Sequence, residues 1–150
     1  MKLEDITTKN FHYSEFFYSK TAKEKNINNT TSNKAILKNL VYTASQIQKI
    51  RELLKKPIII TSGYRCEYLN KLVGGSVNSY HLIGQAVDFV CPKFSNNPND
   101  IIKAIKKSGF EVDQCIAEFT KNSQWVHISF LKKPRNSFLI YDRGTYRKLD

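Results

Sequence analysis

The sequence predicts an α+β fold, in which one long N-terminal helix packs on a small, mainly antiparallel sheet. Three observations predict this fold. Residues 34–55 repeat apolar side chains every three or four positions, five later runs are short and apolar, and one further helical stretch lies among those runs. The length of 150 residues suits one domain that covers residues 1–150.

The first element is a polar segment, residues 1–33, that carries a cluster of aromatic side chains. So many rings in a short stretch indicate docking onto the main body (Phe11, Tyr13, Phe16, Phe17 and Tyr18). Turn-forming residues at 26–33 are suited to precede a helix N-terminus. The helix predicted over 34–55 has one apolar face and many lysines on the other, and Pro57 ends it.

The strands and the shorter helices follow. A β-branched run at 58–61 predicts a buried strand, and a short helix at 67–73 is stopped by Gly74-Gly75. A crossover helix is predicted from a cap at Asn99 through Lys107, with Gly109 after its end. Further strands are expected at 86–90, 114–119, 125–130 and 138–141, with a hairpin loop at 120–123.

The charge balance favours an anionic target. The chain has 24 Lys and Arg against 13 Asp and Glu, a net charge of +11 at pH 7. Nucleic acid, an anionic membrane and an anionic cell wall all satisfy that charge, and so does a plain solubility effect. The lysines are scattered and no nucleic-acid-binding motif is present, so binding to DNA or RNA rests on charge alone.

Two further patterns bound the location of the protein. No apolar run approaches the ~20 residues that span a bilayer, and the N-terminus lacks the apolar core of a secretory signal. Cys66, Cys91 and Cys115 have neither zinc-knuckle nor disulfide-framework spacing. We therefore expect buried free thiols and folding in a reducing cytoplasm.

Polar residues interrupt two of the predicted strands. Asp88 lies within Ala86–Val90, and His127 lies within Trp125–Phe130. Burial of an unpaired carboxylate is expensive, so Asp88 requires a cation, a metal or several donors. With His81 from the preceding loop, two His and one Asp would form a three-ligand zinc set with one open position. The alternative is a hydrogen-bonded core histidine and a buried ion pair.

Glu118 ends an apolar run just before the loop that returns to His127. If residues 114–130 form a hairpin, these two side chains approach each other across the strand pair. A carboxylate near a zinc-bound water is the usual general base of a metal hydrolase. The alternative is a solvated glutamate at a strand end.

Four motifs follow one another along the chain: Ser62-Gly63-Tyr64-Arg65, Asn70 to Ser76, Ser79 to Asp88, and Trp125 to Ser129. In this order they resemble the M15 zinc D-Ala-D-Ala carboxypeptidases, in particular their short branch common in bacteriophages. The pattern SxHxxGxAxD matches at every fixed position, and the likeness covers roughly residues 11–130.

The resemblance implies a Hedgehog/D-Ala-D-Ala peptidase-like fold and one Zn²⁺ per chain. It implies that His81, Asp88 and His127 are the zinc ligands. It further implies that Arg65 anchors or polarises the substrate near the scissile bond and that Ser79 lines the substrate site. The implied activity is hydrolysis of peptidoglycan stem peptides, as a carboxypeptidase or an endolysin-type endopeptidase, with zinc-activated water.

One position departs from the family pattern. Many members have an acidic residue three positions before the last histidine, where this chain has Gln124. An amide cannot act as a base, so we expect Glu118 to replace it. The departure also leaves open a catalytically silent, zinc-bearing domain that binds cell wall or forms part of a virion.

The expected partner is a peptidoglycan peptide, with no specific nucleic acid, and a monomer is favoured. The protein is expected to be made in the cytoplasm without a signal peptide and to act on the bacterial cell wall, as a phage lysis protein or a virion component.

Overall fold

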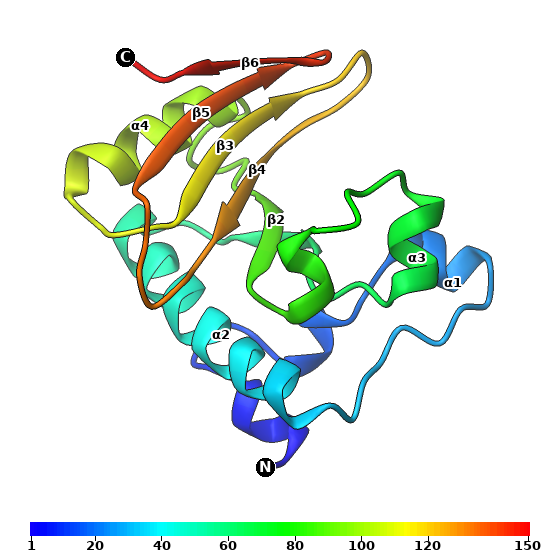
Figure 1. The fold of residues 1–150 in the computed structure, drawn as a ribbon. Coiled ribbons are helices and arrows are strands. Elements are labelled where there is room, and N and C mark those ends of the chain that lie inside the picture. The colour runs from blue at the N-terminus through cyan, green and yellow to red at the C-terminus, as the bar shows by residue number, and fades with distance from the viewer.

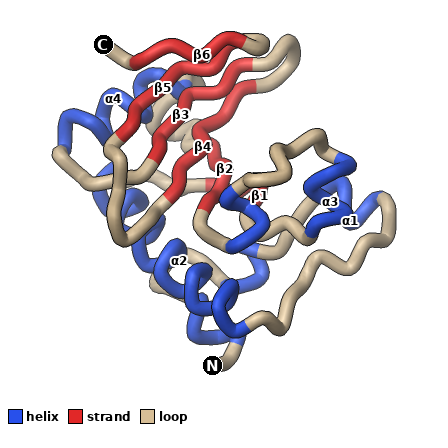
Figure 2. The backbone as a smooth tube through the Cα atoms, viewed as in Figure 1, coloured by secondary structure: helices blue, strands red, loops and turns tan.

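A computed structural model describes residues 1–150 and has an α+β fold (Figures 1 and 2). Six strands form one sheet in the order β1-β2-β4-β3-β5-β6. The strands are β1 (Ile59–Ser62), β2 (Ala86–Val90), β3 (Gln114–Phe119), β4 (Gln124–Ser129), β5 (Ser137–Asp142) and β6 (Thr145–Lys148). The helices are α1 (Lys20–Glu24), α2 (Lys34–Leu54), α3 (Glu67–Leu72) and α4 (Pro98–Ser108), with 3₁₀ turns η1 (Leu3–Ile6), η2 (Tyr13–Phe16) and η3 (Tyr80–Ile83).

The sheet is mixed and, as expected, mainly antiparallel, but it has six strands where five were expected. β3 and β5 pair in parallel, whereas the other four pairings are antiparallel. Both edges of β4 are already taken, by β2 and β3, and the chain that leaves β4 adds at the free edge of the neighbouring strand β3. When it turns back there, it necessarily runs parallel to β3. The sixth strand, β6, is exposed at all four positions and therefore has no apolar pattern to predict it.

Local signals set the ends of the two longest helices. Asn33 caps α2, and its side-chain oxygen accepts hydrogen bonds from the N–H groups of Ala35 and Ile36. The cap of α4 is Asn97, not Asn99 as predicted, because Pro98 occupies the first helical turn, where its missing N–H costs nothing. Gly109 ends α4 at a φ of +78°, a left-handed conformation that glycine adopts easily.

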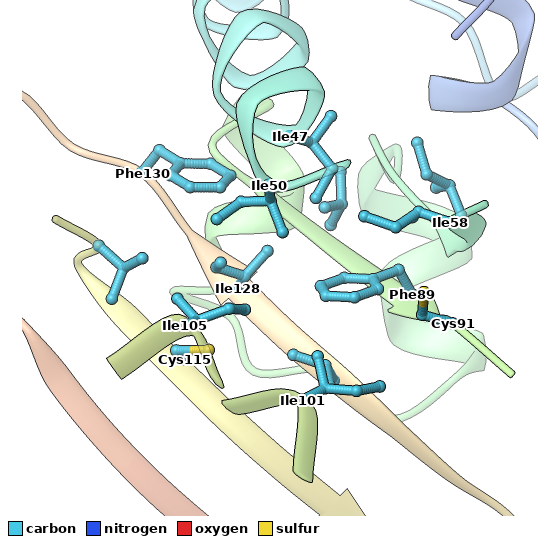
Figure 3. Close-up of a cluster of buried hydrophobic side chains, with 14 of the residues drawn as sticks. Ile47, Ile50, Ile58, Phe89, Cys91, Ile101, Ile105, Cys115, Ile128 and Phe130 are labelled. Atoms are coloured by element: carbon cyan, nitrogen blue, oxygen red, sulfur yellow. The ribbon is translucent and has the colours of Figure 1, made fainter. Parts of the chain in front are cut away.

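The core lies between the sheet and the two long helices, α2 and α4 (Figure 3). Ile47 and Ile50 of α2 and Ile101 of α4 reach towards alternate side chains of the strands, such as Phe89 and Ile128, in the close-up (Figure 3). One cluster of 26 buried apolar residues fills this layer. The helices thus cover one face of the sheet, and the functional residues lie on the other face, which is left open to a cleft.

The N-terminal segment docks onto the body of the protein, which confirms that prediction. Phe11 and Phe16 are almost completely buried. The Phe16 carbonyl accepts a hydrogen bond of 2.8 Å from the Tyr64 N–H, and a β-carbon on Gly63 would lie 2.4 Å from the same carbonyl oxygen. Only glycine therefore allows the segment to lie this close to the chain after β1.

None of the helices has both the length and the apolar character needed to cross a membrane.

All three cysteines are free thiols. Cys91 and Cys115 are buried as predicted, and Cys66 is half-buried.

Candidate metal centre

Three polar side chains from three segments converge on the open face of the sheet. Asp88 and His127 are direct neighbours across the β2–β4 pairing. His81 comes from η3, a 3₁₀ turn that Gly84 closes at a φ of +76°. One potential ligand atom from each of His81, Asp88 and His127 lies within 4.8 Å of the other two.

The hydrogen bonds of His81 fix which nitrogen carries its proton. Nδ1 lies 2.7 Å from the Gly63 carbonyl oxygen, which can only accept, so Nδ1 is the donor. In the neutral ring this leaves a lone pair on Nε2, which faces Asp88 Oδ1 at 3.2 Å. Burial lowers the pKa of His81 more than the Asp88 carboxylate raises it, which favours the neutral ring. A carbonyl behind the ring orients metal-binding histidines in the same way.

Asp88 lies between the two imidazoles. Its Oδ1 is 2.9 Å from His127 Nδ1, and its Oδ2 is 3.3 Å from an Arg65 nitrogen. Burial alone would raise the pKa of Asp88, but His81 and His127 together lower it well below its ordinary value. For His127 the effects have the opposite sign: burial lowers the pKa, but Asp88 raises it by more, so the pKa of His127 is above its ordinary value. The Asp88 carboxylate is therefore favoured as an anion although its side chain is largely buried.

The donor set fits zinc. A lone pair of neutral His81 and an oxygen of ionised Asp88 face each other, an arrangement that is repulsive unless a cation or proton lies between them. Two imidazoles and a carboxylate are a familiar protein ligand set for catalytic Zn²⁺. His81, Asp88 and His127 would hold the ion, which when bound supplies Lewis-acid chemistry that activates water and polarises a carbonyl.

Arg65 is clamped from three sides. Its Nε donates to Ser62 Oγ at 3.0 Å, Nη1 donates to Asn70 Oδ1 at 3.1 Å, and Nη2 donates to Asp88 Oδ2 at 3.3 Å. A guanidinium has five N–H donors, so two remain free to bind a ligand. These contacts fix its guanidinium beside the candidate metal ligands, where it can act as a cationic anchor.

Glu118 lies one strand away from the ligands. Its Oε1 is 4.0 Å from His127 Nδ1 because β3 and β4 pair with Ile116 opposite His127, which places Glu118 on the same face. Burial, aided by the Asp88 charge, raises the pKa of Glu118 to about 7. The expected approach of Glu118 to His127 across a hairpin is therefore present.

Comparison with known families agrees with this geometry. A family model described as peptidase M15 matches residues 9–129, most of the chain and all of the residues above. The chain belongs to the peptidase M15 family. No curated protein matches it. Membership makes it a hydrolase of the metallopeptidase type, in a family that is zinc-dependent.

The other two positions singled out in the sequence lie differently in this M15 peptidase. Ser79 lines the cleft, and its hydroxyl oxygen accepts a 3.2 Å hydrogen bond from the His81 N–H, so it also fixes the His81 turn. Gln124 does not line the cleft. Its amide donates to the Asn96 carbonyl on the far side of β4, away from His127.

Several residues in and behind the cleft carry no signal in the sequence. The cleft has a volume of about 430 Å³. Behind its lining, Asn70 of α3 supports Arg65 and the Gly63 carbonyl supports His81, through contacts that no periodic pattern reveals. Tyr141 and Tyr146 reach the cleft from the last two strands, of which β6 was not predicted at all.

Proposed function

We propose that this M15 peptidase hydrolyses peptide bonds in bacterial peptidoglycan stem peptides, with one Zn²⁺ held by His81, Asp88 and His127. The observation that carries the proposal is the position of Glu118, which lies 4.0 Å from a ligand histidine in the same cleft. We further propose that the fold is of the Hedgehog/D-Ala-D-Ala peptidase type.

The roles of the residues follow from their surroundings. Glu118 is the general base, since it is the only carboxylate besides Asp88 that lines the cleft. Arg65 uses its two unoccupied N–H groups to hold a carbonyl or carboxylate of the substrate. Ser79 contributes a substrate contact from the turn that carries His81.

A catalytically silent binding domain is the competing hypothesis. It was supported by Gln124, which stands where many relatives have an acidic residue. Gln124 points away from the cleft, so its identity says nothing about the chemistry there. We therefore propose an active peptidase and not a silent binding domain.

Digestion of purified muropeptides, followed by mass spectrometry, tests the proposal. The unmodified protein should bind one zinc per chain and release a fragment whose mass identifies the bond cut, at D-Ala–D-Ala, L-Ala–D-Glu or a cross-bridge. Glu118→Gln should keep the zinc and lose at least about 100-fold in rate, the usual contribution of a general base. His81→Ala should lose the zinc and the activity together.

Glu111→Gln is the matched control, because Glu111 is exposed and outside the cleft. It should match the unmodified protein in zinc content and rate. Full activity of Glu118→Gln would show that the base lies elsewhere, and intact muropeptides after incubation with the zinc-loaded protein would favour the binding domain.

We propose the bacterial cell wall as the place of action, as a phage lysis protein or a virion component. The net charge of +11 supports this, since the wall is anionic.

A further inference from the structure

The last two strands add a wall to the cleft. They lie beyond residue 129, where the match to the M15 family ends. Tyr141 of β5 and Tyr146 of β6 both line the cleft that holds the metal ligands and Glu118. Their rings are 4.6 Å apart, centroid to centroid, and tilted by 50°. We call these two residues the tyrosine wall.

The strand register explains why the wall stands next to Glu118. Glu118 pairs with Trp125 on one side and with Tyr141 on the other, and Tyr141 pairs in turn with Tyr146. Paired residues point to the same face of a sheet, so these four side chains form one row across four strands. The row therefore leads away from the metal site towards β6. Figure 1 shows β6 as the strand at that edge of the sheet.

The wall is built on a rigid support. The turn between β5 and β6 has Arg143 and Gly144 at φ values of 44° and 95°, as the tight turns of β-hairpins require. The Arg143 N–H donates to the Phe119 carbonyl at 3.1 Å, which ties the turn to the end of β3. Leu149, just after β6, is buried in the core. Tyr146 is nevertheless 60% exposed, so an anchored hairpin holds a large ring out in the open cleft.

We propose that the tyrosine wall binds the substrate's stem peptide on the side of the scissile bond next to Glu118, and so determines specificity. This rests on the proposed function. Strands are about 4.8 Å apart, so Tyr146 lies about 10 Å from Glu118, a span that about three extended residues cover. The part of the substrate nearest the reacting bond is peptide, so the wall meets peptide before it could meet sugar. Exposed aromatic faces suit the apolar and amide surfaces of such a chain.

The test measures binding apart from hydrolysis. Trp125 is the only tryptophan and stands in the same row, so its fluorescence reports occupancy of the cleft. The probe is a synthetic stem pentapeptide, L-Ala-D-Glu-L-Lys-D-Ala-D-Ala, titrated into zinc-loaded Glu118→Gln protein. A second substitution, Tyr146→Ala, should weaken binding roughly 3- to 10-fold, the range of one aromatic contact. Tyr146→Phe keeps the ring and should stay within about twofold.

Tyr68→Ala is the matched control, because Tyr68 is a similarly exposed tyrosine, on α3 and outside the cleft. Its binding should equal that of the parent. Equal pentapeptide affinities for Tyr146→Ala and Tyr68→Ala would show that the tyrosine wall does not bind the peptide. A loss in Tyr146→Phe as large as in Tyr146→Ala would also overturn it, since the hydroxyl and not the ring would act.

Two outcomes separate the wall from the proposed function. If a disaccharide-linked muropeptide depends on Tyr146 and the free pentapeptide does not, the wall binds glycan and the peptide assignment is wrong. The unmodified protein could instead show no hydrolysis at all, while its affinity for the pentapeptide still depends on Tyr146. In that case the peptide-binding role of the tyrosine wall is confirmed and the proposed peptidase function is wrong.

Discussion

Gly75 occupies a place beside Arg65 that no side chain can share. A β-carbon there would lie 2.1 Å from Asn70 Oδ1 and 2.9 Å from Arg65 Nη1. Asn70 is itself buried, and its amide nitrogen donates to the Ser76 carbonyl, so it cannot move aside freely. The absence of a side chain at Gly75 thus keeps the Asn70–Arg65 hydrogen bond intact.

Gly75→Ala should therefore displace Arg65 and lower kcat/KM for peptidoglycan fragments roughly 10- to 100-fold, the scale of a misplaced binding group. Zinc content should stay at one per chain, since Gly75 touches no ligand. Gly109→Ala is the control. Gly109 lies outside the cleft and has a φ of +78° with open space around it, so alanine should cost about 1 kcal/mol of stability and leave kcat/KM unchanged. Equal kcat/KM values for the two variants would contradict this role of Gly75.

At the scale of residues, the sequence could reveal groups that break a pattern but not groups that lack one. Asp88 and His127 stood out because a polar side chain in an apolar strand is costly unless it has a partner. The support for His81 is a backbone carbonyl, at Gly63, and every residue has one. Only the folded chain shows which carbonyl lies behind the ring.

At the scale of elements, one ion pair joins β3 to the loop that leads into β5. Asp113 is completely buried and accepts two hydrogen bonds of 2.8 Å from the Arg135 guanidinium, and a third from Ser129 at 3.1 Å. Burial alone would raise the pKa of Asp113, but Arg135 and Ser129 lower it below its ordinary value. The pair fixes the crossing that makes β5 parallel to β3.

Asp113→Asn should lower the free energy of unfolding at pH 7 by about 2 kcal/mol, the worth of hydrogen bonds to a charged group. Because the folded pKa is below the unfolded value of about 3.9, the unfolded chain binds the proton first and the contribution is complete above that pH. It is lost as pH falls through the folded pKa, so the two proteins should converge in acid. Denaturant unfolding at several pH values measures this difference.

Asp142→Asn provides the comparison, since both side chains of its ion pair with Arg143 are exposed, by 49% at Asp142 and 71% at Arg143. A loss of less than about 0.5 kcal/mol is expected there. A constant difference between the unmodified protein and Asp113→Asn from pH 7 to pH 3 would show that the charge of Asp113 is not what stabilises the crossing.

Elements with an apolar face were predictable almost to the residue, and the others were not. β2 and β3 have the predicted bounds, because every buried position in them is apolar except Asp88, whose charge marks it out in the sequence. β6 has no buried position, so its place is set by pairing with β5, a contact that sequence periodicity cannot show. The parallel pairing of β5 likewise depends on which sheet edge remains free.

At the scale of the whole molecule, the two faces of the sheet have separate tasks. The face under α2 and α4 holds the core, and the opposite face holds a cleft whose residues come from positions between Arg65 and Tyr146. The cleft's metal end could be inferred from motifs. Its far end, the tyrosine wall, could not, because it depends on the register of four strands.

The net charge of +11 is a property of the whole molecule and not of the cleft. It predicts that the protein attaches to the bacterial cell wall in a salt-dependent way. Screening shortens the reach of exposed charges from about 10 Å at 0.1 M salt to about 3 Å at 1 M salt.

Zinc-loaded Glu118→Gln protein, which should leave the cell wall uncut, is expected to sediment with purified peptidoglycan sacculi at low salt and to be released at high salt. Its affinity for the free pentapeptide should change much less, because the tyrosine contacts are uncharged and Arg65 is largely buried, where salt screens a charge less. Equal sedimentation at both salt concentrations would mean that the basic surface does not provide the attachment. Salt-sensitive binding to DNA that survives His81→Ala would instead give the charge to a nucleic-acid partner.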